Sequence, residues 1–288
     1  MTSLAENSAD VSEITGKLEK AQISVKGPEK LVDQFSNEEK SAIAEVSRLL
    51  LKSEKEGGMC ISKEDVRPRE VAMVTLITKL RVEKAVAKYK QLLDVLKQYG
   101  LSMSSLYENE ELLLAKLGDK WAANYLVAGV DKGGRSAMWL SASEPSKLSE
   151  EQTVVHSGIM YWQAVHSDIT TLRDGCTFVI DTSKQKVLKK VGNERKLQKT
   201  WQSLPLRPQN LFIVGASFLR KIFLNALISF ASVFSNSKVL ARIQFVEMDS
   251  VKECFDPQEL PHELGGHKRP DVSSWIFSRL RAYDGVEI

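Results

Sequence analysis

Apolar residues in the first third of the chain recur every three or four positions, which is the spacing of one face of an α-helix. Ser36 and Glu39 have the spacing of a capping box and predict that a helix starts there. Two further apolar repeats follow beyond Pro68, and Gly100 is suited to cap the last of them. We therefore expect a small all-helical N-terminal domain over residues 31–105.

The pattern changes after this domain. Short runs rich in β-branched and aromatic residues now alternate with stretches of helical spacing. The runs are NYLVAGV (124–130), RSAMWL (135–140), CTFVID (176–181), NLFIVG (210–215) and RIQFVE (242–247). The turn DKGG joins the first two as a hairpin, and predicted helices at 149–172, 184–203 and 217–234 separate the others. This alternation predicts an α/β domain over 106–270, with a mixed, mostly parallel sheet and crossover helices. We expect residues 271–288 to form a C-terminal tail.

The stretch ASFLRKIFLNALISFASVF, residues 216–234, has an apolar arc wider than a surface helix requires. Its polar side chains form one narrow stripe at helical spacing: Lys221, Asn225, Ser229 and Ser232. The apolar arc of a surface helix is usually only about 100° wide. Arg220 and Lys221 would lie in hydrocarbon if the stretch crossed a bilayer, so we do not expect it to span a membrane. Taken alone, it is typical of a buried core helix.

Composition and charge indicate which classes of protein this chain can belong to. The chain has 288 residues, 43% apolar and 27% charged, which is ordinary for a folded protein. A net charge of +3 gives no reason to expect nucleic-acid binding. Residues 1–30 form a predicted flexible polar leader, and three scattered cysteines favour a reducing compartment. The basic run 183–199 is either a solvated helix face or a surface attracted to anionic lipid headgroups.

Motifs for catalysis or metal binding are absent from the sequence. HELGGH at 262–267 places its histidines five apart with two glycines between them, whereas a zinc helix needs a spacing of four. No glycine-rich nucleotide loop and no GxSxG elbow occurs. Cys176 is expected to be a buried apolar residue, and Asp181 to cap the helix that follows its strand. We therefore expect no enzyme, no catalytic residues, no metal and no cofactor.

Five segments resemble, in the right order, motifs of the CRAL-TRIO lipid-binding domain, the family of phosphatidylinositol, tocopherol and retinaldehyde carriers. They are YLVAGVDKGGRSAMWL, CTFVIDTSK, LPLRPQNLFIVGASFLRKIF, ARIQFVE and LPHELGG. LRVEKAVAKYKQLL is similar to the end of the helical unit that precedes the domain in this family. The resemblance implies that the wide apolar helix is a gate over a deep apolar pocket. One side of such a gate packs on the domain or the ligand, and another side can meet the bilayer.

The resemblance and the alternation of strand residues together suggest a set of site residues. Phe178 and Ile180 share one face of their strand, as do Phe212 and Val214, and one of these faces could line a pocket. The predicted lipid pocket and gate comprise Cys176, Phe178, Ile180, Phe212, Val214, Phe218, Ile222, Phe223, Leu227 and Arg242. The predicted membrane and headgroup contacts are Arg207, Arg220 and Lys221.

Departures from the family pattern bear on the ligand. Leu206 stands where the phosphatidylinositol binders carry a glutamate, as it does in the carriers of hydrophobic vitamins. Arg242 replaces a lysine on the last core strand, which keeps the charge but changes its geometry. Arg207 matches a basic position that contacts phosphoinositide headgroups in the tocopherol carriers. The ligand is therefore expected to be a phosphoinositide, another phospholipid or an isoprenoid-like molecule.

We expect a monomeric, non-enzymatic lipid-transfer protein that encloses one lipid or lipid-like molecule and transfers or presents it at membranes. It is expected in the cytoplasm, peripherally associated with membranes, with a preference for anionic lipids and without nucleic acid. A protein partner of unknown identity is left open. Two alternatives remain: a protein-interaction adaptor of the same fold without a ligand, and an unrecognised α/β enzyme.

Overall fold

The computed structural model describes the chain in ten ranges. These are residues 31–52, 61–106, 125–126, 129–141, 151–181, 203–215, 241–260, 262–267, 275–276 and 279–280. None of the helices in these ranges is both long enough and apolar enough to cross a membrane.

The described elements between residues 31 and 106 are helical. They are η1 (Leu31–Gln34), α2 (Asn37–Lys52), η3 (Lys63–Asp65), α3 (Pro68–Ile77) and α4 (Val82–Gln98). The capping box forms at the start of α2: Ser36 N donates to Glu39 Oε2 at 2.8 Å, and Glu39 N donates to Ser36 Oγ at 3.2 Å. Pro68 occupies the first turn of α3, where a missing N–H costs nothing. We refer to residues 31–106 as the helical unit.

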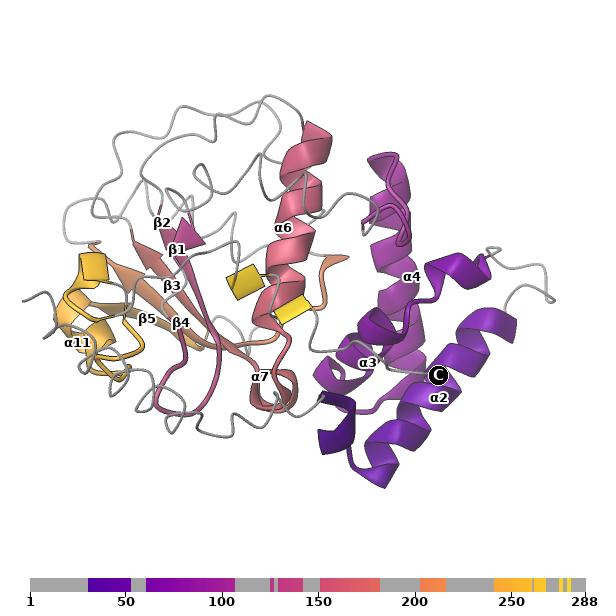
Figure 1. Ribbon diagram of the computed structural model, residues 1–288, viewed down its shortest axis with the longest axis horizontal. Coiled ribbons are helices and arrows are strands. Elements are labelled where there is room, and N and C mark those ends of the chain that lie inside the picture. Colours follow the sequence, from indigo (N-terminus) through magenta and orange to yellow (C-terminus); the bar gives the residue numbers. More distant parts are fainter. Residues whose placement is uncertain are drawn as a thin grey trace, which may run out of the picture.

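A five-stranded sheet follows, in the order β1-β2-β3-β4-β5 (Figure 1). The strands are β1 (Tyr125–Leu126), β2 (Ala137–Ser141), β3 (Cys176–Asp181), β4 (Pro208–Val214) and β5 (Ile243–Val246). β1 pairs antiparallel with β2, and the later neighbours are all parallel. The predicted α/β class with a mixed, mostly parallel sheet is therefore confirmed.

One buried carboxylate holds the turn before β2. Asp131 is 5% exposed, and its Oδ1 accepts hydrogen bonds from the N–H groups of Gly133 (2.9 Å) and Arg135 (3.0 Å). Its Oδ2 accepts from Arg135 Nε at 2.9 Å and from Thr177 Oγ1 at 2.7 Å. Because Thr177 belongs to β3, the same carboxylate shapes the turn and fastens it to the sheet.

The connection from β2 to β3 contains α6 (Glu151–Val165) and α7 (Ile169–Asp174). On one side of α6, Val155, Ile159 and Trp162 belong to the buried cluster of the helical unit. The other buried apolar residues of α6 extend round the rest of the helix: Met160, Tyr161, Ala164 and Val165. Figure 1 shows α6 between the sheet and the helical unit. A helix that is apolar all round is expected where both sides are covered.

Polar pairs join the helical unit to α6 and α7. Arg173 donates from Nε to Glu39 Oε1 at 2.8 Å and from Nη2 to Glu39 Oε2 at 2.7 Å. This bidentate contact lowers the pKa of the Glu39 carboxyl. In the interior, Gln163 Nε2 of α6 donates to Glu70 Oε1 of α3 at 2.6 Å. The two parts are therefore joined by a shared core and by fixed polar contacts.

After β5, α11 (Met248–Lys252) packs on the sheet, and η4 (His262–Leu264) forms the first half of the segment HELGGH. A Cβ on Gly266 would lie only 2.2 Å from Leu260 O, so the second glycine allows a close backbone approach. His262 and His267 are both exposed. Across the described ranges, no three His, Cys, Asp or Glu side chains group closely enough to hold a metal ion.

Gly175 provides a test of how α7 joins β3. It has φ +97°, and a Cβ there would lie 2.2 Å from Arg207 O, which accepts the hydrogen bond from Cys176 N. We expect Gly175→Ala to lower the free energy of unfolding by about 2 kcal/mol or more.

Gly158→Ala is the matched control, because no atom lies within 4 Å of a Cβ in that position of α6. It should instead stabilise the protein by about 0.5–1 kcal/mol. Chemical denaturation of both variants measures the difference, and equal stability of the two would contradict this account.

Candidate functional site

The two faces of the sheet differ in what covers them. Trp139, Val179 and Phe212 lie side by side on one face, and Val214 follows on the same side. They form a buried cluster with the residues of α11 and the segment after it: Val251, Phe255 and Leu260. Figure 1 shows α11 on one side of the sheet and α6 on the other. This first face is therefore closed by protein.

The opposite face is an apolar surface made by adjacent strands. Strand register places Met138, Phe178 and Leu211 in one row, and Ile180, Ile213 and Phe245 in the next. We call these six residues the floor. Its first row and Ile213 are buried, Ile180 is half-buried, and Phe245 on β5 is 54% exposed. The floor thus runs from a closed interior to an open apolar edge.

The predicted strand residues are divided between these two faces. Phe178 and Ile180 lie in the floor, whereas Phe212 and Val214 point to the α11 side. The two pairs cannot line the same side of one pocket, because neighbouring residues in a strand point to opposite faces. We therefore keep Phe178 and Ile180 in the candidate site and leave Phe212 and Val214 out of it.

Sequence reasoning missed four floor residues: Met138, Leu211, Ile213 and Phe245. Alternation within β4 offered both sets, Leu211 with Ile213 and Phe212 with Val214, but did not say which set shares a face with Phe178. Only the register between parallel strands decides this.

Cys176 lies at the start of β3 and is fully buried. Burial raises the pKa of its thiol far above the ordinary value, so the sulfur stays protonated. Its Sγ lies 3.8 Å from Arg207 O. A buried neutral thiol is a packing residue and offers no activated nucleophile.

Arg207 and Arg242 come together where β4 and β5 begin. Arg242 Nη1 donates to Pro208 O at 2.6 Å, and the Arg207 guanidinium donates to Arg173 O. Both arginines are half-buried. The pKa of Arg207 is lowered, first by burial and also by repulsion from Arg242, whereas the charge of Asp174 opposes this shift. Guanidinium groups bind phosphate and carboxylate groups, and these two are close enough for their charges to interact.

The remaining predicted site residues lie outside the described ranges. They are the gate residues Phe218, Ile222, Phe223 and Leu227, and the membrane contacts Arg220 and Lys221. Their roles stay predictions.

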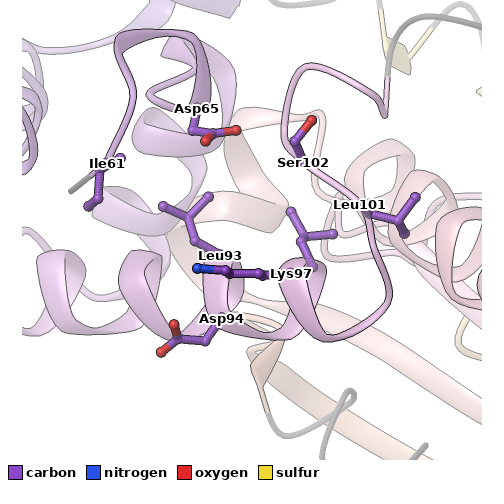
Figure 2. Close-up of a pocket in the computed structure, with 8 residues that line it drawn as sticks. Ile61, Asp65, Leu93, Asp94, Lys97, Leu101 and Ser102 are labelled. Carbon is purple, nitrogen blue, oxygen red and sulfur yellow. The ribbon is translucent and has the colours of Figure 1, made fainter. Parts of the chain in front are cut away.

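A separate cavity lies within the helical unit (Figure 2). Its volume is about 220 Å³, and its lining residues are Ile61, Asp65, Leu93, Asp94, Leu96, Lys97, Leu101 and Ser102. Pockets for drug-sized ligands usually measure about 300–1,000 Å³. The carboxylate of Asp65 is already engaged, because it accepts hydrogen bonds from Met103 N at 3.1 Å and from Ser62 Oγ at 2.9 Å. This cavity is too small for a lipid, and none of its lining residues belongs to the floor.

A comparison of the sequence with protein families gives a match over the part of the chain that contains the sheet. The family model described as CRAL/TRIO domain matches residues 123–266, which are 144 of the 288 residues. The matched span contains all five strands together with α6, α7 and α11. No curated protein matches the chain.

Proposed function

Because the chain belongs to the CRAL/TRIO domain family, we propose that it binds one hydrophobic lipid or lipid-like molecule against the floor and transfers or presents that molecule at membranes. The observation that supports this most directly is Phe245. It is a large apolar side chain, 54% exposed, in register with Ile213 and Ile180. An apolar surface that continues from the interior to an open edge is suited to an acyl chain or a similar apolar ligand.

The topology supports a gate over the same face. The segment 216–240 joins β4 to the adjacent parallel strand β5, and the α6 connection joins β2 to β3 in the same direction across the sheet. Crossovers between parallel strands are right-handed in about 98% of cases. Two right-handed crossovers that move in the same direction across a sheet lie on the same face of that sheet. We therefore propose that the 216–240 connection crosses the floor on the side of α6.

A membrane-facing gate also follows from the energetics of the proposed ligand. Transfer of an acyl chain from an apolar site to water costs about 0.8 kcal/mol for each CH₂ group. A chain of a dozen or more such groups would therefore leave through water very slowly. Opening against a bilayer avoids that cost. The apolar residues Phe218, Ile222, Phe223 and Leu227 of the predicted gate are suited to such contact.

We propose that Arg207 and Arg242 hold the anionic headgroup of a phospholipid, in the pocket or at the membrane surface. Their half-buried guanidinium groups are fixed by the backbone carbonyls of Arg173 and Pro208. Phosphoinositides and other anionic phospholipids carry the phosphate that this pair would bind. The protein is proposed to act as a cytoplasmic monomer that meets membranes transiently.

An adaptor of the same fold, with no ligand, is the alternative from another class. Its floor would be covered by protein side chains alone, and it would not retain lipid. Lipid retention therefore separates the two functions.

Phe245 and Gln244 provide a matched pair for testing the floor. They are adjacent and exposed on β5, but Phe245 lies in register with the floor and Gln244 in register with Phe212 on the opposite face. Phe245→Asp should weaken lipid binding roughly tenfold, because a carboxylate would be placed against the apolar ligand at a cost of about 1–2 kcal/mol. Gln244→Asp should bind lipid like the wild type. Titration with a fluorescent phospholipid measures both affinities.

Thermal denaturation supplies the control for this pair. Both positions are exposed, so each variant should stay within about 0.5 kcal/mol of the wild type. Equal lipid binding by two stable variants would exclude Phe245 from the site.

The arginine pair is tested on liposomes. Arg207→Gln/Arg242→Gln should weaken binding to vesicles that contain phosphatidylserine by about tenfold, since each lost charge removes up to about 1 kcal/mol of attraction. Arg48→Gln/Arg81→Gln removes two exposed arginines of the helical unit and should change binding little. Added salt should weaken the wild type in the same direction. If the first variant and salt both leave vesicle binding unchanged, the proposed electrostatic docking is wrong.

A further inference from the structure

Four described residues near the C-terminus pack against the rest of the protein, in the segment expected from sequence to be a tail. Ile276 and Leu280 are each only 1% exposed. The ring of Trp275 lies 6.2 Å from the ring of Tyr161, measured between centroids. The guanidinium of Arg279 lies 5.4 Å from the Trp275 ring centroid. We call Trp275, Ile276, Arg279 and Leu280 the strap.

The strap contacts α3, α6 and the cap of α7, and each of these partners lies more than 100 residues earlier in the sequence. Trp275 meets Tyr161 on α6. Arg279 Nη1 donates to Asp168 Oδ2 at 3.2 Å, and Asp168 is the residue that caps α7. The carbonyl oxygen of Leu280 accepts a hydrogen bond from the Arg69 guanidinium on α3. The strap therefore bridges the helical unit and the α6–α7 connection.

Asp168 links the strap to the sheet as well. Its Oδ2 also accepts hydrogen bonds from Ser136 Oγ at 2.5 Å and from Thr171 Oγ1 at 2.6 Å. Ser136 immediately precedes β2, so a single carboxylate joins the strap, α7 and the first parallel strand. Loss of Arg279 from this carboxylate would leave the other hydrogen bonds in place.

We propose that the strap is a releasable clamp that holds α6 and α7 against the helical unit, and that its detachment loosens α6 without unfolding the sheet. The described strap residues bury fewer side chains against the rest of the protein than α6 does. The Arg279–Asp168 pair is partly open to water, with side-chain exposures of 21% and 25%. Only two strap side chains are buried, whereas α6 shares the extended core of the helical unit. Elements with few buried apolar contacts open at lower free energy than the whole protein unfolds.

Release of the strap has a consequence for the ligand, and this part rests on the proposed function. Trp275 packs on Tyr161 of α6, and Figure 1 shows α6 beside the sheet, on the side away from α11. An α6 that is free to move on this side would open the space above the floor. Detachment of the strap should therefore speed ligand exchange.

Hydrogen exchange of the full-length chain tests the clamp independently of any ligand. In Trp275→Ala/Arg279→Ala, amide exchange in α6, α7 and α3 should rise roughly tenfold, while β3 and β4 keep their wild-type protection. Arg48→Ala removes the exposed Arg48–Glu45 ion pair and should change none of these elements. If the double variant is unstable, Arg279→Gln is measured instead and should show the same pattern with a smaller rise. Unchanged exchange, or exchange that rises equally in β3 and β4, would overturn the clamp.

Release of a fluorescent phospholipid from the same proteins tests the link to the ligand. The double variant should release the lipid several times faster than the wild type. Equal release rates from two lipid-loaded proteins would overturn the link between strap and ligand. If neither protein can be loaded with lipid, the proposed function fails, and hydrogen exchange still decides whether the strap is a clamp.

Discussion

Helix α6 is covered on two opposite sides, and the arrangement of the whole structure depends on this. Val155, Ile159 and Trp162 share the core of the helical unit, while Met160, Tyr161 and Ala164, on other sides of the helix, are buried as well. Burial of a large apolar side chain stabilises a fold by about 1.5–3 kcal/mol. A single helix thus couples the two parts more strongly than a surface ion pair could. The helical unit is consequently part of the same core and cannot move away without exposing it.

The two faces of the sheet are covered by different elements, and this is the basis for the proposed ligand site. The face with Trp139, Val179 and Phe212 is closed by α11 and the segment after it. The floor lies on the other face, on the same side as α6, and its edge on β5 is open at Phe245. In the proposed site, the strands would form one wall.

Local sequence patterns predicted most of the strands. CTFVID matches β3 in full, and the other core runs overlap β2, β4 and β5 within a few residues. The predicted single helix over 149–172 is instead two helices, α6 and α7. Asp168 ends the first repeat because its side chain accepts a hydrogen bond from Thr171 N and starts a new helix. The apolar spacing continues across this short polar segment, so the spacing alone does not reveal the break between the two helices.

The parts that could not be predicted depend on contacts between distant residues. Alternation in β4 could not assign Phe212 to the α11 side, because this depends on register with β3 and on what packs above each face. The proximity of Arg207 and Arg242 depends on two strand starts that lie 35 positions apart in the chain. No periodic pattern marks Trp275 or Arg279 in the sequence. Their contacts could not be predicted, because their partners Tyr161 and Asp168 lie more than 100 residues earlier.

The proposed function depends on a lipid bound at the floor. A native mass spectrum of the freshly purified full-length protein tests it most directly. We expect a major species heavier than the 32.2 kDa chain by the mass of one lipid, and the added mass should be lost on extraction with organic solvent. A spectrum that shows only the bare chain, from protein produced in several hosts and again after incubation with mixed phospholipids, would contradict the account.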